Sequence, residues 1–162
     1  YGTERTLSIN DEKVQVKIPK GVINGSKLRI RGKGNFQPGT GKRGDIYLKI
    51  EIQPHPIWKL QGNQIKADLP VSLDEIVLGA IVTIVTPDGE TKLTIPPGTN
   101  SGQNLRLKGK GWPSPNGRGD LIFTIKIEIP AHWSSNEKEI FKELRKFRNN
   151  EPREEWLISA RL

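Results

Sequence analysis

The sequence predicts an all-β fold made of two tandem, homologous small β-sandwich subdomains with short helices, followed by a C-terminal amphipathic helix. Short runs of alternating hydrophobic and polar residues, separated by turn residues, are typical of strands in small sheets. A glycine-rich pattern also occurs twice, which indicates two copies of one structural unit. We therefore expect subdomains at residues 1–56 and 57–133, and a helix with a dimerisation tail at residues 134–162.

The repeat covers much of each subdomain. The segments Ile18–Gly21 and Leu28–Gly34 return 77 residues later as Ile95–Gly98 and Leu105–Gly111. After a two-residue difference in length, Arg43-Gly44-Asp45 matches Arg118-Gly119-Asp120. Two homologous halves are the simplest explanation of this spacing.

Each copy of the repeat reads as strands joined by turns. Hydrophobic residues occupy every second position in three segments of the first copy, at residues 14–18, 28–30 and 46–52. This period of two gives a strand one buried and one wet face. Between the strands, Asn24-Gly25 and the glycine-rich segment from Gly32 to Gly44 supply turn residues. The pattern predicts antiparallel meanders and small sandwiches.

Two segments have helical signals. Ser72 and Glu75 have the spacing of a capping box, and Gly79 is placed to end a short helix. Ser134 and Glu137 repeat the capping signal before a helix that we expect to run to about Arg148. Its hydrophobic residues fall on one face, and they are Ile140, Phe141, Leu144 and Phe147. The final Trp156-Leu157-Ile158 is an apolar patch without an obvious role in a monomer.

Composition limits the class of protein. The chain has no cysteine, so it predicts neither disulfides nor cysteine-ligated zinc. Its hydrophobic runs are far shorter than the roughly 20 residues that span a bilayer, so we expect no membrane partner. The net charge of +8 favours nucleic acid, an anionic surface or an acidic peptide, without choosing among them.

No catalytic or metal-binding constellation is found in the sequence. His55 and His132 stand beside strand ends without a partner at metal-ligand spacing. The segment Gly39–Gly44 satisfies G-x-G-x-x-G, but it precedes a strand, whereas the nucleotide fingerprint follows a strand and opens a helix. We therefore predict a non-enzyme without metal or cofactor.

The basic runs keep one alternative open. Residues 29–34 and 106–111 are rich in Arg and Lys and are candidates for contacts with phosphates. Single-strand binders also present aromatic side chains for base stacking, and these runs hold none. A basic nucleic-acid-binding β module is therefore the alternative hypothesis, not the main one.

The motifs together resemble the C-terminal substrate-binding region of DnaJ-type J-domain co-chaperones, in their zinc-free subclass. The resemblance rests on Val16–Gly21, Leu28–Gly34, Gly44–Tyr47, His55–Trp58 and Leu69–Leu73, and on the second-copy motifs through Leu121. The family's J domain, with its His-Pro-Asp signature, is absent, because Ile57 follows His55-Pro56. Tyr1-Gly2-Thr3 is similar to the end of the family's first strand-and-turn unit, so we expect an N-terminally truncated first subdomain.

The resemblance implies a function and its residues. Such a domain binds unfolded client polypeptide in an apolar groove, and it binds the acidic C-terminal tail of a DnaK-type heat-shock chaperone, in the cytoplasm. The resemblance carries the groove to Leu7, Ile9, Val14, Val16 and Trp58, with Leu73 closing one end. Plain core packing is the alternative for each of these residues.

The resemblance also suggests two contacts with other chains. Arg5 corresponds to a basic residue that meets the acidic tail of the partner, and an ordinary solvated charge is the alternative. The last helix and the tail suggest a homodimer, with Phe147, Trp156, Leu157 and Ile158 at its interface.

Overall fold

The computed structural model describes residues 2–36, 38–39 and 41–160. The expectations for Tyr1, and for Gln37 and Thr40 of the glycine-rich segment, fall outside the described residues. The chain forms two compact units, Tyr1–Glu128 and Ile129–Leu162, which are described separately. The boundary that we expect between residues 56 and 57 lies inside the first unit and stays a prediction.

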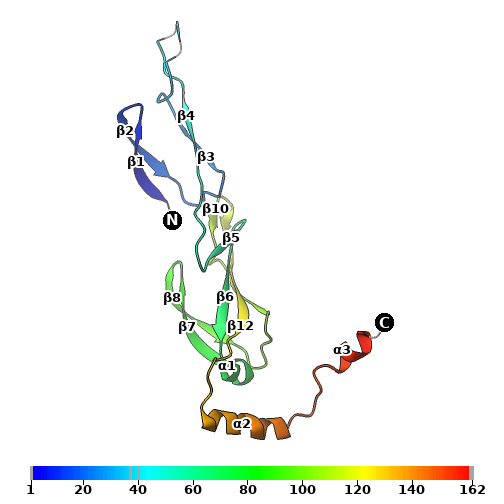
Figure 1. Ribbon diagram of the computed structural model, residues 1–162. Helices are drawn as coiled ribbons and strands as arrows, with labels where there is room; N and C mark the ends of the chain where they lie inside the picture. The colour runs from blue at the N-terminus through cyan, green and yellow to red at the C-terminus, as the bar shows by residue number, and fades with distance from the viewer. Residues whose placement is uncertain (1, 37, 40, 161–162) are drawn as a thin grey trace. The chain divides into compact units, whose positions relative to one another are not determined.

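The first half of the larger unit contains two antiparallel hairpins (Figure 1). Strand β1 (Thr3–Ile9) pairs with β2 (Glu12–Ile18), and β3 (Lys27–Ile30) pairs with β4 (Ile46–Lys49). Asn10 and Asp11, which join β1 to β2, have φ values of 47° and 64°. Asparagine and aspartate tolerate positive φ, which a tight two-residue hairpin turn requires at both positions. The alternating pattern at residues 14–18, 28–30 and 46–52 thus predicted real strands, although β4 is shorter than expected.

The second half is built around a four-stranded sheet with the order β5-β6-β12-β9. Its strands are β5 (Lys59–Gln61), β6 (Gln64–Val71), β9 (Asn104–Leu107) and β12 (Leu121–Ile127). Strands β6 and β12 pair in parallel, which differs from the antiparallel meander that we expected. Parallel neighbours need a long crossover, and here helix α1 (Leu73–Leu78) and the hairpin β7 (Ala80–Thr86) and β8 (Gly89–Ile95) lie between them in the chain. A small hairpin, β10 (Pro113–Ser114) and β11 (Gly117–Arg118), precedes β12.

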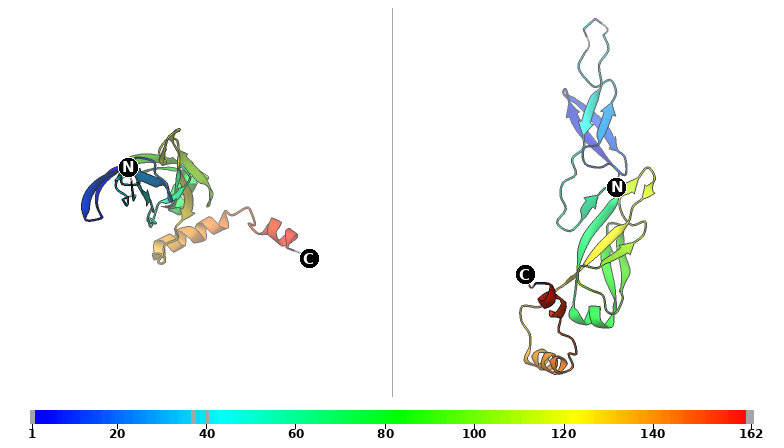
Figure 2. Two further views of the ribbon diagram at one scale, coloured as in Figure 1. Left: turned by 90° about the horizontal axis from the view of Figure 1, so that it is seen from above. Right: turned by 90° about the vertical axis from the view of Figure 1, so that its right-hand side faces the viewer.

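The β7–β8 hairpin packs on one face of this sheet, as Figure 1 and Figure 2 show. Ile84 and Leu93 of the hairpin share a buried cluster with Ile65 of β6 and Phe123 of β12. A second cluster joins Ile76 of α1 to the far ends of the same strands. Ile95, Leu121 and Ile125 are almost completely buried. This half is therefore the small β-sandwich that the sequence predicted.

Two helices begin where the capping signals predicted, and the first also ends at the predicted glycine. Gly79, at φ 79°, follows the last residue of α1, and the Glu75 carboxylate accepts a hydrogen bond from the Ser72 N–H at 2.9 Å. In the smaller unit, the Ser134 hydroxyl accepts from the Glu137 N–H at 3.2 Å and starts helix α2 (Ser135–Lys146). Helix α3 (Glu154–Ser159) follows, and it was not predicted from the sequence. None of the helices in the described part of the chain has the length and apolar character needed to cross a bilayer.

Candidate functional site

Five of the seven predicted groove residues share one face of the β1–β2 hairpin. Leu7 lies directly opposite Val14 in the strand register, and Arg5 lies opposite Val16. Residues opposite one another in an antiparallel pair project to the same face, as do alternate residues along one strand. Ile9 therefore continues the same row, and the hairpin gathers Arg5, Leu7, Ile9, Val14 and Val16 on a single side, which we call the hairpin face.

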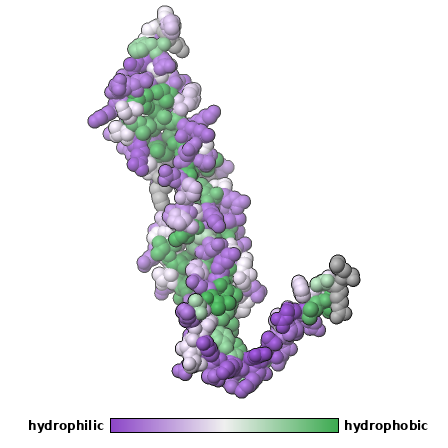
Figure 3. Space-filling model, in the orientation of Figure 1, coloured by the Kyte–Doolittle hydropathy of each residue, from purple (hydrophilic) through white to green (hydrophobic). Residues whose placement is uncertain are grey.

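Burial changes across the hairpin face. Val14 and Val16 on β2 are buried, with 9% and 6% of their surface exposed. Leu7 and Ile9 on β1 are half-buried, and Arg5 is exposed. Hydrophobic side chains show among polar ones over the β1–β4 half in the space-filling view (Figure 3). The apolar row therefore runs from a buried strand to a strand that is partly open to solvent.

The backbone of β1 is open as well. Within the described ranges, β1 pairs with β2 and with no other strand. A strand with one partner presents a row of unpaired N–H and C=O groups along its other edge. An extended chain placed there would gain both backbone hydrogen bonds and the apolar side chains of the hairpin face.

Trp58 and Leu73 lie in the second half of the unit. Trp58 packs against the cluster around Ile65, with its ring 6.1 Å from that of Phe123 in an edge-on arrangement. Leu73 packs against the cluster around Ile76. Neither cluster includes a residue of the hairpin face. Both side chains contribute to cores, and their assignment to a peptide groove stays a prediction.

Trp58 also lines an apolar pocket of about 670 Å³. Most of its wall comes from residues 52–55, which link the two repeats, and from residues 58–60 at the start of the second sheet. Trp112 supplies a second indole. His55 fixes the linker turn, because its Nδ1 accepts hydrogen bonds from the Ile57 and Trp58 N–H groups at 3.1 and 3.2 Å. This is a structural role for His55, in line with its reading as a strand-end histidine.

An ionic contact at the hairpin turn was missed by the sequence analysis. Lys33 Nζ donates to Glu12 Oε2 at 2.6 Å, and Arg43 Nη1 donates to Glu12 Oε1 at 2.7 Å. The hydrogen bonds from Lys33 and then Arg43 lower the pKa of the Glu12 carboxyl below its ordinary value. We call these three residues the Glu12 clamp. Lys33 and Arg43 both belong to the repeated motifs, but nothing in those motifs identifies Glu12 as their partner.

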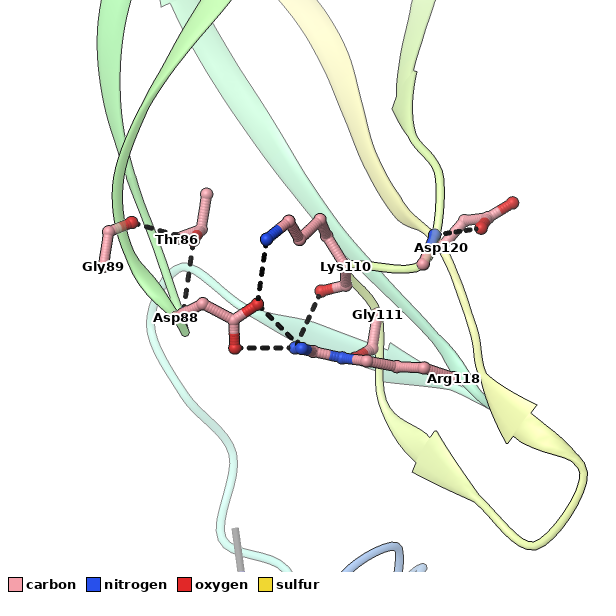
Figure 4. A network of polar contacts seen from close by, with 8 residues as sticks. Thr86, Asp88, Gly89, Lys110, Gly111, Arg118 and Asp120 are labelled. Carbon is pink, nitrogen blue, oxygen red and sulfur yellow. Dashed lines mark hydrogen bonds and ion pairs between the residues drawn. The ribbon is translucent and has the colours of Figure 1, made fainter.

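The second half contains a similar contact at the turn of its own hairpin (Figure 4), although by the repeat spacing Asp88 corresponds to Asp11 and not to Glu12. The two terminal nitrogens of Arg118, Nη2 and Nη1, lie 2.8 Å from Oδ1 and Oδ2 of Asp88, respectively. Lys110 Nζ lies 3.8 Å from Oδ2 of the same carboxylate. Arg118 is itself fixed, because its Nε donates to the Gly111 carbonyl at 2.7 Å. By the repeat spacing, Lys110 and Arg118 correspond to Lys33 and Arg43. The repeat therefore preserves an ionic contact between each hairpin and the glycine-rich motif.

The other repeated charges also have partners inside the chain. Asp45 accepts from the Gly32 N–H at 2.9 Å and from Arg29 Nε at 2.6 Å. In the second copy, Asp120 accepts from the Gly109 N–H at 2.8 Å, and Arg106 lies 3.5 Å from it. Gly32 and Gly109 adopt φ values of 64° and 68°, which glycine allows without strain. Much of the basic run thus stabilises turns, which weakens the case for these particular residues as phosphate contacts.

The predicted dimer residues are exposed in the smaller unit. Phe147, Trp156, Leu157 and Ile158 all have large exposed fractions. Phe147 joins Phe141 and Leu144 of α2 around a shallow pocket of about 350 Å³. Phe141 is also held by Trp133, whose ring centroid lies 4.9 Å away. These apolar side chains have the character of an interface, and their role in a dimer stays a prediction.

No arrangement of His, Asp and Glu able to hold a metal ion occurs among the residues that the structure describes. The polar groups of the site are carboxylates paired with cations, and no described buried side-chain N or O atom lacks a partner. What the site offers is an apolar face with an open strand edge. An apolar face beside an unpaired strand edge is the kind of surface to which an extended polypeptide can add.

Comparison with known proteins identifies the family. The family described as DnaJ C terminal domain matches residues 1–130. A DnAJ-like protein of Synechocystis sp. is 43% identical over 154 residues, which cover 94% of this chain and 46% of the relative. Chaperone protein DnaJ of Roseiflexus sp. is 39% identical over 142 residues, covering 86% of this chain and 38% of the relative.

A third relative has a different name. Curved DNA-binding protein of Escherichia coli is 40% identical over 144 residues, covering 88% of this chain and 47% of the relative. The chain thus spans about half of the length of these curated relatives or less. The profile match and the relatives agree with the motifs and with the two-copy β architecture, and the chain belongs to the DnaJ C-terminal domain family.

Proposed function

We propose that this chain binds unfolded client polypeptide along the hairpin face, next to the open edge of β1. The observation that supports this most directly is the burial gradient across the hairpin, from buried Val14 and Val16 to half-buried Leu7 and Ile9. A client segment in extended conformation would add backbone hydrogen bonds to β1 and place alternate side chains on the apolar row. Membership of the DnaJ C-terminal domain family is consistent with this proposal.

We expect the proposed site to bind a client segment with low affinity. Two or three client side chains buried at roughly 1.5–3 kcal/mol each provide about 3–9 kcal/mol before the cost of ordering the peptide is subtracted. A single site then binds with about micromolar affinity or weaker. Reversible capture of many different clients requires weak binding of this kind.

The finer parts of the proposal concern partners. The exposed side chain of Arg5 lies at one end of the apolar row, where it would pair with a carboxylate of an acidic C-terminal tail on a DnaK-type chaperone. A homodimer through α2 and α3 would place two sites on one assembly and raise the effective concentration for a long client. Both partners, and a cytoplasmic location, are proposals.

A pair of double substitutions tests the client site. Leu7→Asp with Ile9→Asp places charges on the hairpin face, whereas Thr6→Asp with Ser8→Asp places the same charges on the other face of the same strand. We expect the first variant to lose at least about tenfold in affinity for a leucine-rich peptide, because charged groups resist burial without partners. The second variant should bind like the wild type. If both variants bind the peptide with the same affinity in fluorescence anisotropy, the client site does not lie on the hairpin face of β1.

Nucleic acid binding is the second candidate function. It is supported by the net charge of +8 and by the name of the E. coli relative, a curved DNA-binding protein. The two candidates differ in their response to salt, because phosphate contacts release counterions and weaken steeply as salt rises. Titrations with the leucine-rich peptide and with duplex DNA at several salt concentrations separate them. Binding of DNA alone, with a steep negative salt slope, would favour the second candidate.

A further inference from the structure

The β1–β2 hairpin has few supports of its own. It forms a two-stranded sheet without a third strand among the described residues. Two-stranded hairpins are marginally stable in water unless something packs against them. Among the described residues of the first half, Val14 and Val16, both on β2, are the only hydrophobic side chains that are buried. The position of β1 therefore depends on contacts that reach the hairpin from elsewhere in the chain.

The Glu12 clamp provides such a contact. Glu12 is the first residue of β2 and lies directly opposite Ile9 in the register. Its partners come from the glycine-rich segment, 21 and 31 residues further along the chain. The clamp therefore joins the turn end of the hairpin, next to the apolar row, to a separate segment.

The glycine-rich segment holds the two cations together. The Gly34 N–H donates to the Gly44 carbonyl at 2.8 Å, and the Gly44 N–H donates to the Asn35 carbonyl at 2.9 Å. These bonds bring Lys33 and Arg43, which precede Gly34 and Gly44, side by side. Arg43 is further held against the ring of Phe36, with its guanidinium carbon 4.6 Å from the ring centroid. Lys33 and Arg43 are thus positioned by contacts that do not involve Glu12.

The second half offers a natural comparison. There, the ion pair between Asp88 and Arg118 joins the β7–β8 hairpin to the glycine-rich motif. The inner face of this hairpin is buried, because Ile84 and Leu93 are only 7% and 5% exposed. The β7–β8 hairpin is also held on its sheet by these buried side chains, which pack against Ile65 and Phe123. The clamp in the first half acts instead on a hairpin whose outer strand is half-buried. The same ionic contact therefore has more influence on position in the first half than in the second.

We propose that the Glu12 clamp is a positioning device that holds β1 and β2 at the placement needed for client binding. This inference rests on the proposed function. The three side chains are 29 to 40% exposed, so salt reaches the clamp and weakens it. Binding of a client peptide without charged groups therefore acquires a salt dependence that comes from the protein and not from the peptide.

The experiment compares the wild type with Glu12→Gln and with the matched variant Asp88→Asn. The probe is a leucine-rich peptide without charged side chains, titrated at about 0.1 M and 1 M NaCl, where the Debye length falls from about 10 Å to about 3 Å. Hydrogen exchange of the β1 and β2 amides is measured on the free proteins. We expect Glu12→Gln to weaken binding about threefold to tenfold, since exposed ion pairs are individually modest. Its affinity should no longer fall with salt, and exchange in β1 should rise.

The variant Asp88→Asn should bind like the wild type and keep the wild-type salt dependence. The charge reversal Glu12→Lys with Lys33→Glu serves as a rescue, and part of the affinity and salt dependence should return. If the wild type binds, and Glu12→Gln binds as tightly as the wild type at both salt concentrations, the positioning role is refuted while the proposed function stands. If the wild type does not bind the peptide, the proposed function fails. In that case hydrogen exchange alone tests whether the clamp holds β1 in position. Unchanged exchange of the β1 amides in Glu12→Gln would refute this role.

Discussion

At the scale of single residues, Asp45 shows what the repeated Arg-Gly-Asp motif does. One carboxylate oxygen accepts the N–H of Gly32, and the other accepts from Arg29. The hydrogen bond from Gly32, and then that from Arg29, lowers the pKa of the Asp45 carboxyl, while Asp45 raises the pKa of Arg29. Asp45 therefore closes a turn that begins at a glycine with positive φ.

The lowered pKa of Asp45 makes a prediction about acid stability. A group with a lower pKa in the folded than in the unfolded state stabilises the fold above the unfolded value, near pH 4, and this contribution is lost as pH falls through the folded value. We expect the free energy of unfolding of Asp45→Asn to be lower at neutral pH and to fall less than that of the wild type between about pH 5 and pH 2. Urea unfolding at several pH values measures this.

A suitable control is Asp68→Asn, at an exposed position of β6. It removes the same charge and should keep the pH dependence of the wild type. Identical pH profiles for Asp45→Asn and the wild type would show that Asp45 does not stabilise the fold through its charge.

At the scale of elements, the two hairpins are copies with different environments. By the repeat spacing, Leu7 of β1 corresponds to Ile84 of β7. Ile84 is buried between β7–β8 and the four-stranded sheet, whereas Leu7 is half-buried. In the second half, β12 has both β6 and β9 as neighbours, whereas its counterpart β4 pairs with β3 alone among the described strands. The difference in sheet size explains why one hairpin is sealed and the other is partly open.

This difference predicts unequal costs for equivalent truncations. Ile84→Ala should lower the free energy of unfolding by about 2–5 kcal/mol, because it leaves a cavity in a closed core. Leu7→Ala should cost under about 1.5 kcal/mol, because part of its side chain is already in water. Urea denaturation of the two variants provides the comparison. Equal losses would mean that the hairpin face is closed and unavailable to a client.

At the scale of the whole molecule, the smaller unit presents apolar surface that nothing in the described chain covers. Its helix α2 has an apolar face, and α3 carries Trp156, Leu157 and Ile158 at exposed positions. Deleting residues 149–162 should shift the protein toward a monomer in sedimentation velocity experiments, because it removes these three side chains. The binding of a short peptide should be unchanged, and that of a long client should weaken through lower effective concentration. An unchanged mass after the deletion would refute the dimer role of the tail.

The sequence predicted the parts of the fold that depend on local patterns. Alternating residues marked the strands, and Ser72 and Ser134 marked two helix starts. The parallel pairing of β6 with β12 was not predicted, because strands far apart in the chain carry no local signal of their pairing. The Glu12 clamp was missed for the same reason, since its partners are 21 and 31 residues away.

The candidate site was predicted in part. The register brings five of the predicted residues to one face, and they are Arg5, Leu7, Ile9, Val14 and Val16. The alternating pattern of β2 and the resemblance to the DnaJ family had suggested these residues. Trp58 and Leu73 pack against the cores of the second half, and their place in a groove stays a prediction. A hydrophobic residue looks the same in a sequence whether it lines a groove or packs in a core, so only the arrangement of the strands distinguishes the two.

Hydrogen exchange with and without a bound peptide tests the central proposal most directly. If an extended client segment adds to the edge of β1, the amides of residues 3–9 should exchange more slowly when the leucine-rich peptide is present. The equivalent amides of β7, residues 80–86, should be unaffected, and they provide the internal control. Protection of β7 or of another segment, with no change in β1, would contradict the proposed binding site.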